Sequence, residues 1–486
     1  MLAVPDAVTL VAERRSHEVE NQVECDAEQS SDHEIAIAQS HHCGASLVEV
    51  CPIERDRESS VTRAMTLPPM SPTAAQSTSV TFDHAPTQAP TQALPGQLDQ
   101  WLAMHGSDLV AIRRHIHMYP ELSNKEFETA DLIRRTLSAA GLQPRLIPGG
   151  NGVICDIGSG ERIVALRADI DALPLFDIKN VPYRSTVDGV THACGHDVHT
   201  TILLGVGLAL AELDLLGELG GRVRLLFQPS EECFPSGAPQ MISAGALKDV
   251  SAIFALHCAP QFPVGLVGVR SGAFTAACDA VEVKLTGRGG HTARPHLTAD
   301  LVNALARVVT EVPSLLSRRV DARAGLSMVF GSISAGDAFN AIPHEGVTRA
   351  TIRVLNRDAW REAPELITQL IKEVVAPTGA KAVVNYTRGI PPVINDRMAS
   401  AVIAGAAGAA LGADRVVEAE ISMGGEDFAF YLEHVPGAMI RLGTGIPGSD
   451  IKMDIHQASF DVDERCIGYG IRTMMHTAFA ALASAF

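Results

Sequence analysis

The chain has 486 residues, of which 46% are hydrophobic and 20% charged, so it is long enough for two or three domains with large cores. A net charge of −17 argues against nucleic-acid binding and against attraction to an anionic membrane. No apolar run reaches the roughly 18 residues of a membrane span. Nine cysteines without a framework, and an acidic start unlike a secretory leader, lead us to expect a cytoplasmic protein.

The first fifth of the chain differs in composition from the rest. Up to residue 98 it has one aromatic residue, Phe82, and its 14 acidic and 5 basic residues give a net charge of −9. Such a segment cannot bury enough apolar surface to offset its ordering entropy, so we expect residues 1–97 to be a disordered acidic tail. His41, His42 and the cysteines nearby match no zinc-binding spacing, so we expect no second metal site there.

Regular structure is predicted from residue 98 onward. Apolar residues recur at helical spacing over 98–117, and strand-like runs then alternate with helical ones. This alternation predicts an α/β catalytic domain with a mainly parallel sheet and helices on both faces. The strand-like runs that precede the chemical motifs are 163–167, 223–227 and 253–257.

The pattern changes near residue 278 and changes back near residue 391. Between them the order is strand, helix, two strands, helix and strand, which predicts an inserted ferredoxin-like α+β satellite domain. The predicted elements are 280–286, 300–316, 326–333, 345–355, 364–375 and 381–386. The expected organisation is therefore a catalytic domain in two parts, 98–277 and 391–486, interrupted by a satellite domain at 278–390.

The densest chemistry lies in His192–Thr201, which places a thiol, three imidazoles and a carboxylate directly before an apolar helical run, 202–216. Burying such groups is costly unless they surround a cation, so the run indicates a metal site. The alternative is an ordinary polar helix start, with Asp197 or Thr200 as the cap.

Further candidates follow at intervals along the chain. Glu231 and Glu232 come just after a predicted strand, and neighbours on an extended segment point in opposite directions, so one can bind metal while the other faces a substrate. His257 ends the next strand, where a lone histidine is more often a satisfied core residue. His291 and His456 stand in two further motifs.

Taken in order, these motifs resemble the amidohydrolase branch (subfamily D) of the M20 metallopeptidase family, which includes N-acyl-amino-acid, hippurate and auxin-conjugate hydrolases. The resemblance runs from residue 98 to the C-terminus. It rests on the runs 114–122, 167–175, 194–197, 228–232, 256–257, 290–296, 339–343 and 423–428 together with His456.

The resemblance implies a centre with two divalent metal ions per subunit, which are zinc, manganese, cobalt or nickel in the family. The implied ligands are Cys194, His196, Glu232, His257 and His456. Asp169 and Asp171 would orient these ligands from behind; for that pair a strand-end turn with local capping is the alternative.

The resemblance also implies the reaction and its participants. Glu231 would be the general base and acid toward a metal-activated water. His291, from the partner subunit of a homodimer or homotetramer joined through the satellite domain, would stabilise the oxyanion. Asn340 would contact substrate, and Arg388 would grip the substrate carboxylate unless it is only a strand-end surface residue.

We therefore expect a metal-dependent amidohydrolase that cleaves N-acyl amino acids to a carboxylic acid and a free amino acid. The alternatives are an M20-type dipeptidase or carboxypeptidase, and a catalytically silent binding protein of the same fold. The turn at residues 233–239 lacks the glycine-rich pattern of many relatives, so the acyl group and the amino acid stay open.

Overall fold

The structure is a computed structural model that describes residues 94–213, 219–448 and 453–486. Almost all of the predicted acidic tail, with its histidines and cysteines, lies outside these residues. Helix α2 (Leu94–Met118) begins at Leu94 rather than at residue 98. Within the described ranges, every helix is too short or too polar to cross a bilayer.

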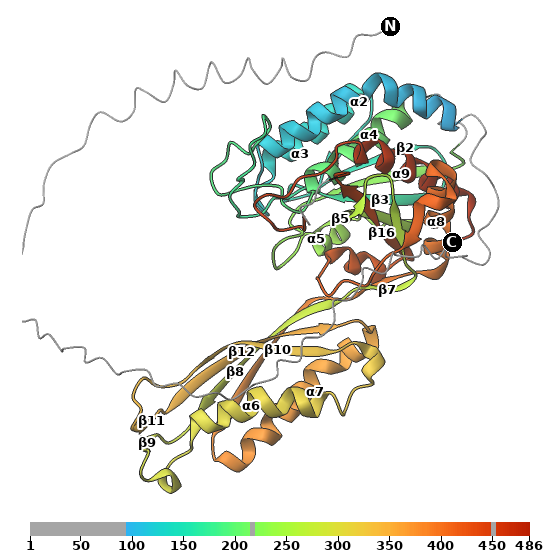
Figure 1. The fold of residues 1–486 in the computed structure, drawn as a ribbon. Coiled ribbons are helices and arrows are strands. Elements are labelled where there is room, and N and C mark those ends of the chain that lie inside the picture. Colours follow the sequence, from blue (N-terminus) through green and yellow to red (C-terminus); the bar gives the residue numbers. More distant parts are fainter. Residues whose placement is uncertain (1–93, 214–218, 449–452) are drawn as a thin grey trace, which may run out of the picture. The chain divides into compact units, whose positions relative to one another are not determined.

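Eight strands of the described residues form one sheet in the order β1-β2-β4-β3-β5-β16-β6-β15 (Figure 1). The central strands β4, β3, β5 and β16 are mutually parallel, β6 is parallel to β15, and the other three pairings are antiparallel. This confirms the mainly parallel sheet. The strands are β1 (Arg145–Leu146), β2 (Val153–Gly158), β3 (Ile163–Asp169), β4 (Arg222–Gln228), β5 (Val250–Pro263), β6 (Val267–Val269), β15 (Val416–Glu418) and β16 (Gly437–Gly445).

Helices cover both faces of this sheet, as predicted. One face packs against α4 (His196–Glu212), α8 (Arg397–Leu411) and α9 (Cys466–Ala483), with α2 and α3 (Phe127–Ala139) packed against α4 from outside (Figure 1). The other face holds a separate core with α5 (Ala238–Ser243) and the 3-10 helix η5 (Asp427–Glu433).

Strand alternation assigns each side chain of β3 to one of these two faces. Val164, Leu166 and Ala168 belong to the core under α4, whereas Ile163 and Ala165 belong to the core under α5. The same alternation places Arg167 and Asp169 on the α5 side. Polar groups at the ends of the central strands are therefore directed to that face.

The inserted segment forms its own sheet and its own hydrophobic core. Its strands run in the order β10-β12-β8-β13, all pairings are antiparallel, and α6 and α7 pack together against them (Figure 1). The elements are β8 (Ala277–Thr286), α6 (Leu301–Leu316), β10 (Ser327–Ser334), β12 (Glu345–Val354), α7 (Arg357–Val375) and β13 (Lys381–Ile390). This is the predicted ferredoxin-like order.

The start of α7 differs from the prediction. The sequence analysis predicts a first residue at Pro364, and proline is in general common in the first turn of a helix. The helix instead begins at Arg357, where the Asn356 side chain accepts a hydrogen bond from the Ala359 amide, and Pro364 lies inside it. A good N-cap outweighs the proline signal here.

The remaining described elements are short. Two pairs of strands are formed, β7 (Gly272–Thr275) with β14 (Val393–Asn395) and β9 (Gly290–His291) with β11 (Ala341–Ile342). The 3-10 helices are η1 (Pro295–Leu297), η2 (Ala322–Ala324), η3 (Ala376–Thr378) and η4 (Ala413–Arg415).

The packing of α9 on α4 gives a stability test. A Cβ added at the buried Gly470 would collide with the Ile202 side chain, whereas at Gly468 it would meet only the end of the flexible Arg472 side chain. We expect Gly470→Ala to destabilise the protein by about 1–3 kcal/mol through overpacking. Gly468→Ala should be neutral or stabilising by up to about 1 kcal/mol, since alanine is the better helix former. Urea unfolding of both variants checks this, and equal midpoints would contradict it.

Candidate metal centre

The candidate site lies where the central parallel strands end. Asp169 and Gln228 are partners in the β3–β4 register, and Arg441 is the partner of His257 between β16 and β5. Partners in parallel strands share a face of the sheet. These four residues therefore lie on the α5 side, at the edge where open α/β sheets usually bind ligands.

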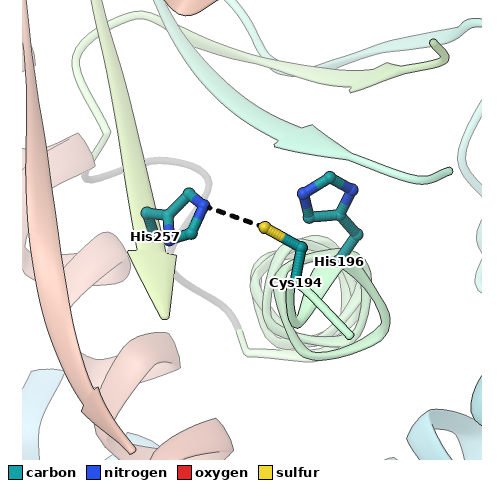
Figure 2. A group of neighbouring side chains, drawn as sticks. All are labelled: Cys194, His196 and His257. Atoms are coloured by element: carbon teal, nitrogen blue, oxygen red, sulfur yellow. Dashed lines mark hydrogen bonds between the residues drawn. The ribbon is translucent and has the colours of Figure 1, made fainter. Parts of the chain in front are cut away.

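The start of α4 contributes the next two groups. The helix begins at His196, and the residue before it, Gly195, has φ of +90°, a conformation that suits glycine. A Cβ at Gly195 would also lie 2.7 Å from Cys258 Sγ. Cys194 and His196 project from this turn toward His257 of β5 (Figure 2).

The alternative of a helix start capped by Asp197 or Thr200 is wrong. Neither residue is the N-cap, because the N-cap is Gly195 and α4 already starts at His196, before both of them. The Asp197 carboxylate instead pairs with Arg113 and His117, and the Thr200 hydroxyl donates to the Asp169 carbonyl.

The five predicted ligands come together in space. Cys194 Sγ lies 3.4 Å from His257 Nε2, and Glu232 Oε1 lies 3.1 Å from His456 Nε2 and 3.8 Å from His196 Nε2 (Figure 2 shows the first contact). Two groups of three, Cys194–His196–His257 and Cys194–Glu232–His456, each have their donor atoms within 4.8 Å of one another.

Hydrogen bonds to Nδ1 of His196 and of His257 determine that Nε2 of each ring faces the other proposed ligands. His196 Nδ1 lies 2.9 Å from the Asp171 carbonyl oxygen, and His257 Nδ1 lies 2.7 Å from the Cys258 carbonyl oxygen. Both Nδ1 atoms must donate, so once each ring is neutral its Nε2 presents the lone pair, as in histidines that bind metal. His196 Nε2 is buried and has no hydrogen-bond partner within the described part of the chain. The residues therefore fit a bound divalent cation, since a thiol, two such imidazoles and a carboxylate oxygen are the donors it needs.

His199, the third imidazole of the motif, has a different role. Its Nδ1 lies 2.5 Å from Asp169 Oδ1, and its Nε2 accepts the Cys258 amide hydrogen at 2.8 Å. With both nitrogens engaged it cannot be a ligand, and it orients Asp169 instead. Sequence reasoning assigned His199 no role, because spacing alone cannot separate a ligand from its neighbour.

Asp169 and Asp171 both lie next to His196. Asp169 Oδ2 lies 2.5 Å from an Arg167 nitrogen and 3.7 Å from His196 Nε2. Asp171 Oδ2 accepts from the Glu232 amide at 2.9 Å. Burial alone would lower the pKa of His196, but these two aspartates outweigh it and raise that pKa to about 10.

Glu231 faces a second set of buried carboxylates. It is 8% exposed, and its carboxylate lies within 4.8 Å of donor atoms of His196 and Glu232, and also of Glu426 and Asp427. Burial first, and then Glu426 and Glu232, raise the pKa of Glu231 well above its ordinary value. Burial likewise raises the pKa of Asp427 to about 7, although Arg167 opposes the rise. So many carboxylates around a single arginine indicate a place for added positive charge.

The backbone of the loop that carries Glu231 is hydrogen-bonded to the buried carboxylate of Glu126. Ser230 has φ of +58°, which L-residues rarely adopt, and its amide donates to Glu126 Oε1 at 2.8 Å. The other oxygen of Glu126 accepts from Asn151 Nδ2 at 3.0 Å, and Glu126 is fully buried. Sequence reasoning missed Glu126 because nothing in its neighbourhood marks it as a partner for a loop 104 residues later.

The satellite residues form a separate group. His291 on β9 lies opposite Ala341 on β11, so Asn340 adjoins it. His291 Nδ1 accepts the Ala293 amide hydrogen at 3.0 Å, so the ring proton is on Nε2. The ring is exposed. Arg388 instead contacts the start of α7, with its guanidinium 4.5 Å from the Trp360 ring and 2.5 Å from the Arg361 carbonyl oxygen.

Fold and site together define a metal-dependent hydrolase. The model of peptidase family M20/M25/M40 matches residues 165–480. An N-acetyl-L-cysteine deacetylase of Bacillus subtilis is 37% identical over 361 residues, which cover 74% of this chain and 84% of that protein. A solved dinuclear metal-binding peptidase of the M20 family from the same organism is 32% identical, with a TM-score of 0.70, over 79% of this chain and 99% of that one.

The chain therefore belongs to the M20 family and to its amidohydrolase branch, which confirms the resemblance. A Rhodococcus jostii protein named as a glutamate–cysteine ligase is 45% identical over 369 residues. This match covers 76% of the present chain but only 46% of that protein, so the chain spans about half the length of that relative.

Glu126 gives a test of how the catalytic loop is held. We expect Glu126→Ala to lower kcat by at least tenfold, because small displacements of a catalytic group are costly and up to ~10²-fold is typical. Glu126→Gln keeps an acceptor for the Ser230 amide and should retain kcat within a few-fold. Bound metal should be equal in both variants, measured by atomic emission. If the glutamine variant loses as much as the alanine variant, the hydrogen bond is not the reason for the loss.

Proposed function

We propose that this protein hydrolyses the amide bond of N-acyl amino acids and releases a carboxylic acid and a free amino acid. The observation that supports this most directly is Glu231, a buried carboxylate with a raised pKa beside the Glu232 donor atom. The B. subtilis relative named as an N-acetyl-L-cysteine deacetylase supports an acyl amino acid as substrate.

We propose Cys194, His196, Glu232, His257 and His456 as the ligands of two divalent ions, either zinc, manganese, cobalt or nickel. The dinuclear centre named for the solved M20 relative supports the number two. When bound, such ions polarise the scissile carbonyl and lower the pKa of water from near 16 toward ~7. Asp169 and Asp171 keep the ligands oriented through the contacts described above.

In the proposed reaction Glu231 moves the proton. Its carboxylate accepts one proton from the attacking water, the water oxygen bonds to the amide carbon, and the C–N bond breaks as Glu231 returns the proton to the departing nitrogen. A carboxyl whose pKa lies well above its ordinary value is suited to both halves of this transfer.

The tetrahedral oxyanion needs a donor, and His291 Nε2–H is our proposal. The tautomer supports it, since the Ala293 amide occupies Nδ1 and the ring is exposed. We propose that it acts on the site of a partner subunit, through a homodimer or homotetramer joined by the satellite domain, and that Asn340 beside it contacts substrate. The proposed domain limits remain 98–277, 278–390 and 391–486.

The substrate class is tested with metal-stripped protein and a panel of N-acyl amino acids and dipeptides. Each compound is assayed with and without added Mn²⁺, Zn²⁺, Co²⁺ or Ni²⁺, and amino-acid release is measured. Metal-dependent release from acyl amino acids is the expected result. Release from dipeptides alone would favour the dipeptidase alternative, and silence with metal bound would favour a binding protein.

Glu231 has its own test. Glu231→Gln should keep its metal, because Glu232 and the other proposed ligands are unchanged, while kcat falls by at least ~10², the contribution typical of general acid–base catalysis. Metal content by atomic emission and turnover are measured on the same sample. Retained turnover would remove Glu231 as the base.

The partner contribution of His291 is tested by mixing subunits. His291→Ala alone should lose about 10²–10³ in kcat, the usual cost of an oxyanion donor. Mixed with Glu231→Gln, it should regain activity, since one heterodimer site then combines an intact Glu231 with an intact His291. If no activity returns in isolated heterodimers, His291 acts within its own subunit.

A further inference from the structure

One arginine beside the candidate ligands has no assigned partner. Arg441 lies on β16 opposite His257 of β5 in a parallel register, so both side chains project from the same face of the sheet. Met439, two residues earlier, belongs to the core on the α5 side, which confirms the face. Arg441 therefore borders the candidate metal centre from the strand next to a ligand.

Its guanidinium makes no hydrogen bond and no ion pair within the described residues. Its guanidinium carbon lies 4.9 Å from the centroid of the Phe274 ring, and Glu426 attracts its charge without a hydrogen bond. Gly268, its neighbour on the other side in β6, has no side chain to engage it. A guanidinium over an aromatic ring keeps its five N–H donors in its own plane, where they can reach another group.

The buried arginines of the catalytic domain, Arg113, Arg167 and Arg224, all form ion pairs within the described residues. Arg113 pairs with Asp197, Asp461 and Glu464, and Arg167 pairs with Asp169, Glu426 and Asp427. Buried charges are normally paired in this way, because an unpaired one is costly. Arg441 is partly buried and forms no ion pair within the described residues, although Glu426 lies near enough to act on its charge, so its donors can bind an anion that comes from outside the chain.

The residue first expected to bind the substrate carboxylate is engaged elsewhere. Arg388 lies against the Trp360 ring and donates to the Arg361 carbonyl, so one of its donor nitrogens is already used. Arg441 differs because none of its donors makes a hydrogen bond in the part of the chain that the structure describes, and because it adjoins the site where the amide would be cleaved.

We propose that Arg441 binds the carboxylate of the amino-acid half of the substrate and so selects acyl amino acids over neutral amides. The inference rests on the proposed function and identifies a specificity residue for it. A guanidinium matches a carboxylate with two parallel hydrogen bonds, which a lysine ammonium cannot reproduce.

The test uses the metal-loaded protein and two substrates that differ only in this group, N-acetyl-L-methionine and N-acetyl-L-methioninamide. For Arg441→Met we expect kcat/KM to fall on the order of 10²-fold for the acid, a typical cost of losing a charge pair. For the amide the change should stay within about threefold. Arg441→Lys should lose less on the acid than Arg441→Met, and it keeps the test open if the methionine variant does not fold.

A binding measurement separates recognition from turnover. In a Glu231→Gln background with metal bound, calorimetry should show that Arg441→Met weakens binding of the acid and leaves binding of the amide unchanged. Equal losses for both compounds, or no loss for either, would overturn the role of Arg441 while leaving the hydrolase intact. If the unmodified protein neither binds nor cleaves either compound, the proposed function itself fails, and this inference fails with it.

Discussion

The structure depends on a concentration of buried lone pairs and negative charge at the ends of its central strands. Six carboxylates, those of Asp169, Asp171, Glu231, Glu232, Glu426 and Asp427, lie in one region, and Arg167 is the cation that ion-pairs with three of them. Arg167 and the neighbouring Arg441 together carry too little positive charge to balance this set, and the raised pKa of Glu231 expresses the imbalance. Divalent ions held by the neighbouring thiol and imidazoles would supply the missing charge.

The fold makes this concentration possible by separating the two faces of the sheet. Strand alternation fills the face under α4 with apolar side chains and leaves the ends of the other face for Asp169, Gln228 and His257. Helix α4 then adds Cys194 and His196 from a turn that its glycine permits. The loop of Glu231 needs a left-handed Ser230, and Glu126 stabilises that backbone from the far side.

Much of this could be predicted from the sequence because it is local. The alternating strands and the order of the satellite elements follow from periodicity, whereas the five proposed ligands, which lie between residues 194 and 456, were implied only by the resemblance to a known family. The start of α7 could not, because it is set by the Asn356 cap, whose hydrogen bond to the Ala359 amide forms only in the folded backbone. His199 shows the same limit inside a motif, since its hydrogen bonds to Asp169 and Cys258 depend on the folded backbone.

Glu126, Arg388 and Arg441 show what sequence patterns cannot supply, because each acts through a residue distant in the chain. Glu126 meets Ser230, and Arg388 meets Trp360, through contacts that no spacing indicates. Arg441 is the most informative of the three, because its guanidinium forms no hydrogen bond and no ion pair within the described residues. Charges in a folded interior are normally matched, so a guanidinium left free beside a cluster of metal-binding groups indicates that its partner arrives with the substrate. Chemistry and selectivity would then come from adjacent strands, with His257 of β5 toward the metal and Arg441 of β16 toward the carboxylate.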